Sequence, residues 1–204
     1  MNKRVWRFIR LMMILGIIAL LMKVVPIVKT GYDMYKDAIS ESSIPLKIET
    51  LQSDESYVSI DQISPLFLEK VIESEDRMFY EHDGINLIST TRAMLKNISA
   101  GSTVEGGSSI TQQLAKNMYF SFEKRYERKV AELFVAFDLE ALLEKEVILE
   151  LYCNIAYFGE GCYGLKEATI HYYGIEPKDL NDEQATLLVR TLKSPNLFNP
   201  NTNN

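Results

Sequence analysis

Three carboxylates crowd into four residues at Glu73, Glu75 and Asp76, shortly before His82, one of the two histidines in the chain. Like charges at this spacing repel one another, so water or a ligand must stabilise them. Aromatic and turn residues follow in the stretch FYEHDG, which indicates that part of the cluster lies in a walled site. A carboxylate with restricted hydration has a raised pKa, and this suits a general base. The alternative is an ordinary solvated helix end.

Cationic residues form a second group, in a chain whose body is otherwise acidic. Its members are Lys116, Lys124, Arg125, Arg128 and Lys129. The glycine pair 106–107 precedes the helix that carries Lys116, and glycines let a backbone approach a ligand closely. Cations near a helix N-terminus are typical of a phosphate site. The alternative is a solvated face paired with Glu123 and Glu127, and the lack of a Walker A pattern argues against a nucleotide-binding loop.

Glu132 lies four residues after Arg128, on the same side of a predicted helix. This order of charges is the weaker one for supporting a helix, so it favours another role. A carboxylate beside a cationic phosphate site could hold a divalent cation such as Mg²⁺ or Mn²⁺. His82 and His171 lack ligand-spaced partners in the sequence, so we expect both to be structural.

Helical patterns must position these residues, and they cover most of the chain after residue 64. We expect helices over residues 65–76, 87–100, 109–120, 165–173 and 181–193, and a longer pattern over 125–159 that is broken around 143–145. Ser109 and Gln112 form an S-x-x-Q capping box at the start of the third helix, and Gly174 ends the helix over 165–173. The body is therefore predicted to be mainly α.

Two finer expectations concern the longer pattern and the segment before the first helix. An apolar stripe at i, i+3, i+4, i+7 spacing predicts the side of the longer pattern that faces the core. Its members are Val130, Leu133, Phe134, Phe137 and Ala141. The alternation of residues 57–60 predicts one short strand.

The N-terminal segment predicts a membrane anchor. Residues 11–28 are apolar except for Lys23, close to the roughly 20 residues that a spanning helix needs. Arg4, Arg7 and Arg10 precede the run, which places the N-terminus in the cytoplasm and the body outside. A cleaved signal peptide is the alternative, but large or charged residues follow where a small-residue cleavage site is expected.

Charge and cysteine content set further limits. The first 30 residues hold six basic and no acidic side chains, and the other 174 have a net charge of −12. An acidic body argues against nonspecific nucleic-acid binding. Cys153 and Cys162 lie in an exported domain, where a disulfide and two buried thiols are both open possibilities.

Four ordered stretches resemble the signature motifs of the peptidoglycan glycosyltransferases, which include monofunctional transglycosylases and the transglycosylase domain of class A penicillin-binding proteins. They are EDRMFYEHDG, GGSSITQQLAKN, RKVAE and KEVILELYCNIAYFG. The resemblance runs from about Tyr57 to Pro200. It implies a mainly α, lysozyme-like domain with a membrane-proximal jaw. The expected division is a cytoplasmic tip and anchor over 1–30, a juxtamembrane stalk over 31–56 and the glycosyltransferase domain over 57–204.

The resemblance also implies the reaction, polymerisation of lipid II into β-1,4-linked glycan with inversion and release of undecaprenyl pyrophosphate. Glu75 matches the catalytic base, and Glu132 the second essential glutamate, which orients the cations or a metal ion. Lys116, Lys124 and Arg128 match residues that hold the pyrophosphate. Residues expected to bind substrate in the same cleft are Asp76, Arg92, Ser108 and Gln112.

The implied location is the bacterial plasma membrane, crossed once, with the catalytic domain outside the cytoplasm. Residues 86–98 are the candidate jaw because their apolar content exceeds what a small core needs. Implied partners are lipid II, the growing glycan strand, the membrane, penicillin-binding transpeptidases and proteins of the division or elongation machinery, without nucleic acid.

Two other functions remain as alternatives. A lytic, lysozyme-like glycosidase also uses a glutamate near a helix end, but cutting a finished glycan requires no pyrophosphate site. A catalytically idle, membrane-anchored scaffold is the third hypothesis. The end of the chain at Asn204 motivates it, because relatives commonly continue through another basic helix, and the joint presence of Glu75, Lys116, Arg128 and Glu132 opposes it.

Overall fold

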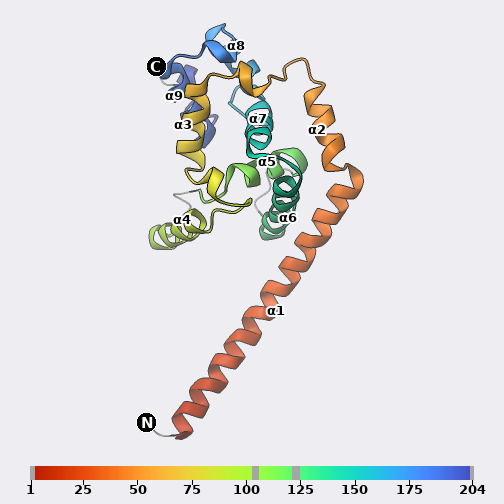
Figure 1. The fold of residues 1–204 in the computed structure, drawn as a ribbon. Helices are drawn as coiled ribbons and strands as arrows, with labels where there is room; N and C mark the ends of the chain where they lie inside the picture. Colours follow the sequence, from red (N-terminus) through yellow and green to blue (C-terminus); the bar gives the residue numbers. More distant parts are fainter. Residues whose placement is uncertain (1–2, 103–105, 121–124, 203–204) are drawn as a thin grey trace.

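The computed structural model of the chain describes residues 3–102, 106–120 and 125–202 (Figure 1). Helices dominate this part of the chain, and no strand occurs within it. The α-helices are α1 (Lys3–Glu41), α2 (Ile44–Gln52), α3 (Pro65–Glu75), α4 (Leu87–Ala100), α5 (Ile110–Tyr119), α6 (Tyr126–Leu142), α7 (Lys145–Ile155), α8 (Leu165–Tyr173) and α9 (Asp182–Lys193). Short 3₁₀ turns are η1 (Ile60–Gln62), η2 (Phe79–Glu81), η3 (Pro177–Asp179) and η4 (Pro200–Thr202). The prediction of a mainly α domain with one apolar N-terminal helix is confirmed.

Local signals begin and end these helices where the sequence predicts. The Ser109 side chain accepts a hydrogen bond from the backbone N–H of Gln112, and the Gln112 side chain accepts one from Ser109, so the predicted capping box is present. Gly174 ends α8 in the left-handed conformation, with a φ of 66° that a glycine adopts without strain. The break between α6 and α7 falls at residues 143–144, as expected.

Helix α5 lies at the centre of the domain and packs against both α6 and α7, while α3 packs against α9 (Figure 1). The buried core joins these elements and the loops around them. Fully buried members include Phe67, Ile110, Leu114, Leu139, Leu151 and Leu188. Because α5 is covered on several sides, the polar side chains along it must find partners inside the protein or reach its surface.

Helix α6 buries a different face from the predicted one. Ala131, Val135 and Leu139 are fully buried in the core, whereas Phe137 from the predicted stripe is 45% exposed. Another stripe member, Phe134, packs against Tyr32 of α1, with ring centroids 5.2 Å apart. Helix α6 therefore has two apolar faces, one packed in the core and one packed on α1. The predicted stripe follows the second face, so it does not identify the side that lies in the core.

The predicted strand over residues 57–60 is also wrong. These residues pair with a side chain, since Asn154 accepts a hydrogen bond from the Val58 N–H and donates one to the Val58 carbonyl, both at 2.8 Å. An amide side chain presents one donor and one acceptor, like a backbone peptide group. The alternating residues thus make ladder-like bonds with α7 instead of joining a sheet.

Helix α1 extends well past the predicted anchor segment, as a rod that projects from the domain (Figure 1). It is long and apolar enough to cross a membrane, and none of its most apolar window is buried. Its last turns dock on α6, where the Tyr35 hydroxyl donates to Asp138 at 2.7 Å. The chain boundaries at residues 30 and 56 stay a prediction.

Replacement of Gly31 should loosen this docking. A Cβ at Gly31 would lie 2.6 Å from both the Glu127 carbonyl oxygen and Val130 Cβ, whereas a Cβ at Gly16 of the same helix meets nothing within 4 Å. We expect Gly31→Ala to cost about 2 kcal/mol and to lower Tm by roughly 4–8 °C in thermal unfolding of the full chain in detergent. The matched variant Gly16→Ala should be neutral or slightly stabilising. Equal Tm values for the two variants would contradict the close approach.

Candidate active site

The structure separates the three crowded carboxylates. Glu73 is exposed at 67% of its side chain and lies 3.5 Å from Arg77. Asp76 is buried, and Glu75 is half-buried at the C-terminal end of α3. Successive helix residues point about 100° apart, so residues within one turn can face solvent, a neighbouring helix and the core. The repulsion expected from the sequence is thereby relieved.

Asp76 forms hydrogen bonds to residues of three neighbouring segments. Its Oδ2 atom lies 2.8 Å from His82 Nε2 and accepts from the Ile110 N–H at 3.2 Å, and its Oδ1 atom accepts from Asn86 at 3.1 Å. Ile110 is the first residue of α5, where a negative charge also complements the helix dipole. Asp76 therefore links the end of α3 to the following loop and to the start of α5. Its expected contact with substrate stays a prediction.

Glu75 faces α5. Its Oε1 atom accepts from the Ser74 hydroxyl at 3.2 Å, and its Oε2 atom accepts from Gln113 Nε2 at 3.1 Å. Gln113 was missed by the sequence analysis, which selected Gln112 beside it. The capping box could have indicated Gln113 in the sequence. It engages the Gln112 side chain at the start of the helix, so the next glutamine, three residues before Lys116, is the one left to contact Glu75.

Glu132 is the centre of the cation cluster, which we define as Lys116, Arg128 and Lys129. The Glu132 side chain is 1% exposed. Arg128 Nη1 lies 2.6 Å from its Oε1 atom, an ion pair whose angle is poor for a hydrogen bond, and Lys129 Nζ donates to Oε2 at 2.9 Å. Burial lowers the pKa of Lys116; Arg128 and Lys129 lower it further, and Glu132 opposes them. One buried carboxylate thus holds several cations together.

Two members of the cation cluster have additional donor groups that the Glu132 carboxylate does not use. Lys129 also donates to Ser108 Oγ at 2.6 Å, which places Ser108 at its edge. The Arg128 Nε atom is buried and has no hydrogen-bond acceptor among the described residues. A buried donor without a partner is uncommon in a folded protein, and an anionic ligand would satisfy it. Lys129 belonged to the cationic group in the sequence but not to the predicted site.

The remaining predicted site residues are placed unevenly. Gln112 is buried and engaged in the capping box, and Arg92 is exposed on α4. Lys124 lies outside the described residues. Gly107 was expected to let the backbone approach a ligand, but its backbone packs against α4, where Thr90 donates to the Gly107 carbonyl at 2.9 Å. A Cβ at Gly107 would lie 2.9 Å from Ala93 Cβ.

The donor set around Glu132 does not fit a divalent cation. Both of its oxygens already contact cationic side chains. No group of three His, Cys, Asp or Glu side chains that could hold an ion occurs within residues 3–102, 106–120 and 125–202. These side chains offer no free carboxylate for a bound metal ion, and a divalent cation as cofactor stays a prediction.

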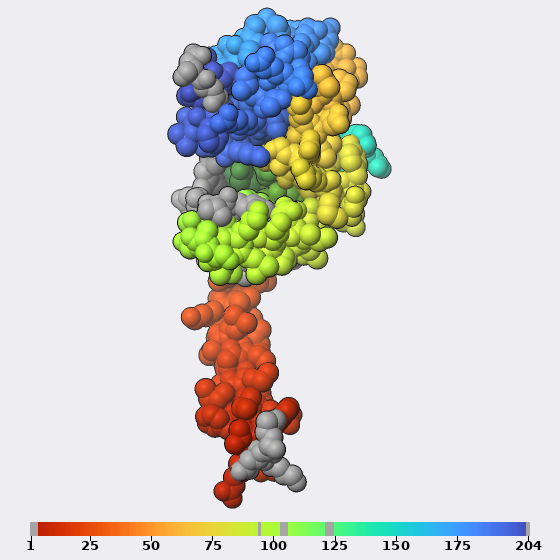
Figure 2. Space-filling model, turned by 90° about the vertical axis from the view of Figure 1, so that its left-hand side faces the viewer, coloured from red at the N-terminus to blue at the C-terminus, as the bar shows by residue number. Residues whose placement is uncertain are grey.

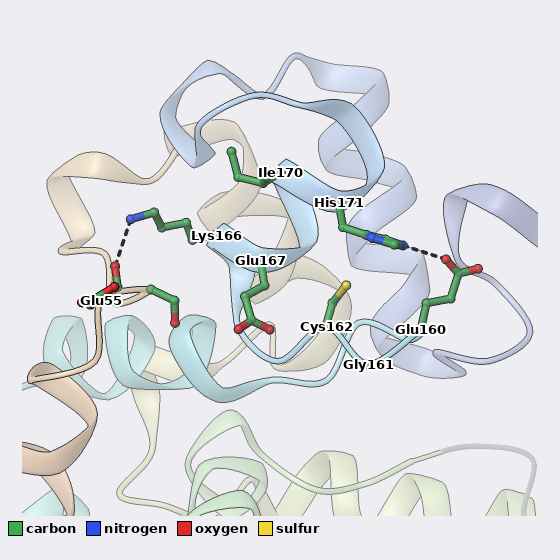
Figure 3. Close-up of a pocket in the computed structure, with 9 residues that line it drawn as sticks. Glu55, Glu160, Gly161, Cys162, Lys166, Glu167, Ile170 and His171 are labelled. Atoms are coloured by element: carbon green, nitrogen blue, oxygen red, sulfur yellow. Dashed lines mark hydrogen bonds and ion pairs between the residues drawn. The ribbon is translucent and has the colours of Figure 1, made fainter.

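A cavity of about 550 Å³ lies away from these residues, at the α8 end of the domain (Figure 3). Across it, His171 pairs with Glu160 at 2.8 Å, and Lys166 donates to the Glu55 carbonyl at 3.0 Å. Cys162 lies in its wall, and both it and Cys153 are buried free thiols whose pKa values are raised by burial. None of the predicted site residues lines this cavity.

Together these features define a class: a helical domain with an apolar N-terminal helix, a half-buried carboxylate on α3 that faces α5, and a cation cluster shared by α5 and α6. A family model described as transglycosylase matches residues 45–204. The chain is 34% identical to the biosynthetic peptidoglycan transglycosylase of Nitrosospira multiformis over 179 residues, which cover 84% of this chain and 78% of the relative. The chain belongs to the peptidoglycan transglycosylase family.

Larger relatives carry the same domain. The chain is 43% identical over 143 residues to penicillin-binding protein 1F of Bacillus subtilis, which covers 70% of this chain and 20% of that protein. It is 42% identical over 139 residues to penicillin-binding protein 1B of Escherichia coli, which covers 66% of this chain and 16% of that protein. The chain thus spans about a fifth or less of the length of these two relatives.

Proposed function

We propose that this protein polymerises lipid II into β-1,4-linked glycan strands, with release of undecaprenyl pyrophosphate. One observation carries the proposal: α5 joins both halves of the chemistry. Gln113 on this helix bonds to Glu75, and Lys116, three residues later, belongs to the cation cluster. Side chains three apart lie on neighbouring positions of one helix face, with Cβ atoms about 5–6 Å apart. The residue that bonds to the base and a residue of the cation cluster are thereby placed one helical turn apart on α5.

In the proposed reaction, Glu75 takes the proton from the 4-hydroxyl of the acceptor sugar. The freed oxygen attacks C1 of the lipid-linked sugar at the end of the growing strand and forms the new C–O bond. The bond from C1 to the pyrophosphate oxygen breaks, and its electron pair leaves on the pyrophosphate. Negative charge grows there, so fixed cations stabilise the transition state more than the ground state.

The cation cluster supplies this stabilisation. Lys116 and Lys129 contribute ammonium groups, and Arg128 contributes a planar fork of donors that suits phosphate oxygens. The Arg128 Nε and Nη1 atoms are buried and have no hydrogen-bond acceptor among the described residues, and a pyrophosphate oxygen that reached them would supply one. Lys124 is proposed as a further contact on the basis of the family motif.

The cation cluster favours this reaction over the lytic alternative. A hydrolase that cuts finished glycan releases no pyrophosphate, so it has no use for buried cations. Glycosidases also commonly need a second carboxylate free to act on the sugar. Asp76 is 4% exposed and bonded to His82, Asn86 and the Ile110 N–H, which makes it a poor candidate for that role.

We also propose that the domain sits outside the cytoplasm with α4 in the membrane surface. Helix α4 lies at the end of the domain from which α1 projects (Figures 1 and 2). Leu87, Ile88, Leu95 and Ile98 on this helix are each more than 60% exposed. Ala93 faces the opposite way and is buried against Gly107. An exposed apolar face beside an anchor helix is typical of a segment that enters the lipid surface.

A tryptophan placed on α4 should report this immersion. The chain has one tryptophan, Trp6, so the background variant is Trp6→Phe. In vesicles with brominated lipid tails, we expect the fluorescence of Leu95→Trp to be quenched. Leu197→Trp, at an equally exposed position close to the C-terminus of the chain, should keep its fluorescence. Equal quenching at both positions would contradict the proposed orientation.

The proposed activity is tested with the full chain in detergent, labelled lipid II and Mg²⁺, on a gel that resolves glycan chains. A ladder of polymer is the expected result. Folded protein that makes no polymer would contradict the proposal and favour the scaffold function. Penicillin-binding transpeptidases and proteins of the division or elongation machinery are proposed partners, because the larger relatives are named penicillin-binding proteins.

A further inference from the structure

We propose that Tyr152 is a positioning residue that orients the Gln113 amide so that its NH₂ group faces Glu75. The inference rests on the proposed function, in which Glu75 is the base. Tyr152 belongs to α7 and, in the described part of the chain, makes no direct hydrogen bond to Glu75. It acts on the base through one intervening side chain of α5.

Two hydrogen bonds form the connection. The Tyr152 hydroxyl donates to Gln113 Oε1 at 3.3 Å, and Gln113 Nε2 donates to Glu75 Oε2 at 3.1 Å. Tyr152 is 2% exposed, and Gln113, which bonds to both Tyr152 and Glu75, is half-buried. The connection thus leads from the core of the domain to the carboxylate at its edge.

The direction of these bonds follows from the chemistry of the three groups. An amide has one end that accepts and one that donates, and a carboxylate only accepts. If the Gln113 amide turned over, its oxygen would face the Glu75 carboxylate and the two would repel. The Glu75 carboxylate therefore selects the orientation in which the NH₂ group faces it, and the Tyr152 hydroxyl holds that orientation by donating to the amide oxygen.

The phenol keeps the proton that this selection requires. Burial raises the pKa of Tyr152 well above its usual range, and the nearby charge of Glu75 raises it further. Tyr152 therefore keeps its proton, and stays a donor, at neutral pH. Because Ser74 donates to the other oxygen of Glu75, the carboxylate is held at both oxygens, and its remaining lone pairs are free to accept the proton of a sugar hydroxyl.

The effect belongs to the chemical step, since neither Tyr152 nor Gln113 is in the cation cluster that is proposed to bind pyrophosphate. A misoriented base lowers the rate of proton removal but leaves the affinity for lipid II in place. We therefore expect kcat to fall and KM to stay unchanged when the connection is broken. General loss of structure would change both.

The experiment is a double-mutant cycle in the full chain, with Tyr152→Phe, Gln113→Leu and the double variant. We expect Tyr152→Phe to lower kcat about tenfold and Gln113→Leu about 10- to 100-fold, each with KM for lipid II within twofold of wild type. The double variant should be no slower than Gln113→Leu, because Tyr152 acts only through Gln113. Tyr172→Phe is the matched control: its hydroxyl donates to the Phe158 carbonyl at 2.9 Å in another part of the domain, and its kcat should equal that of wild type.

Each result decides one question. If wild type makes no polymer, the proposed function fails and the cycle is not reached. If wild type is active and Tyr152→Phe matches it in kcat, the positioning role is overturned while the function stands. Independent losses that multiply in the double variant, or a rise in KM together with a lowered Tm, would likewise overturn it, because they indicate a structural role.

Discussion

Glu75→Gln is expected to abolish polymerisation of lipid II while the protein stays folded. The amide has the shape of the carboxylate but cannot take the proton of the acceptor hydroxyl, and general base catalysis contributes about 10²–10⁴-fold to a rate. The side chain is half-buried and bonded to Ser74 and Gln113, so an isosteric change leaves the packing intact. The measurement is the initial rate of glycan formation on the gel, with Tm recorded in the same detergent.

The matched control for this prediction is Glu73→Gln, two residues earlier. Glu73 is exposed and its pair with Arg77 lies at the surface, where such pairs contribute little. Its rate should equal that of wild type. If both variants lose activity equally, the cluster acts through its overall charge and Glu75 is not the base. If Glu75→Gln stays fully active, the base lies elsewhere.

Glu132→Gln is expected to have the second largest effect, on both activity and stability. Removal of the carboxylate leaves Lys116, Arg128 and Lys129 close together with no buried counter-charge. Loss of one partner from a buried ion pair costs about 3–5 kcal/mol, so Tm should fall by roughly 6–20 °C. The cations should then separate, and we expect the rate of polymerisation to fall about 100-fold, as when a fixed donor to a developing negative charge is lost.

The two effects can be separated by comparison with Asp33→Asn and Glu132→Asp. Asp33 pairs with Lys29 at 3.2 Å on the exposed surface of α1, so its loss should change neither Tm nor rate beyond error. Glu132→Asp keeps the charge with a shorter reach, and we expect an intermediate Tm. A Glu132→Gln variant that unfolds like wild type and polymerises at the wild-type rate would contradict the central position of this residue.

Much of this protein was determined by local sequence. The capping box of Ser109 and Gln112 and the glycine at position 174 define helix ends through bonds within a few residues, so no distant contact is needed to predict them. The apolar run before residue 28 similarly predicts an anchor from length and composition alone. Glu75 and the cationic group were also identifiable, because charged residues crowded near turns and apolar stretches are unusual enough to indicate a site.

Tertiary packing alone decided how these residues act. The sequence shows three carboxylates within four residues, but Glu73 is exposed, Glu75 bonds to Gln113 and Asp76 is buried against the start of α5. It shows two adjacent glutamines, and only the packing of α5 assigns Gln112 to the helix cap and Gln113 to Glu75. The strand predicted at residues 57–60 and the stripe on α6 failed for the same reason, since their partners, Asn154 and α1, are distant in sequence.

The connection from Tyr152 to Glu75 is the clearest case of this division. Gln113 is 38 residues from Glu75 and 39 from Tyr152, and the three residues lie on three different helices. No periodicity or spacing within one helix predicts that their polar groups meet. Burial brings them together, because a phenol and an amide enclosed by packed helices must bond to whatever polar group lies beside them. The sequence thus determined which chemical groups are present, and the packing of α3, α5 and α7 determined which of them touch.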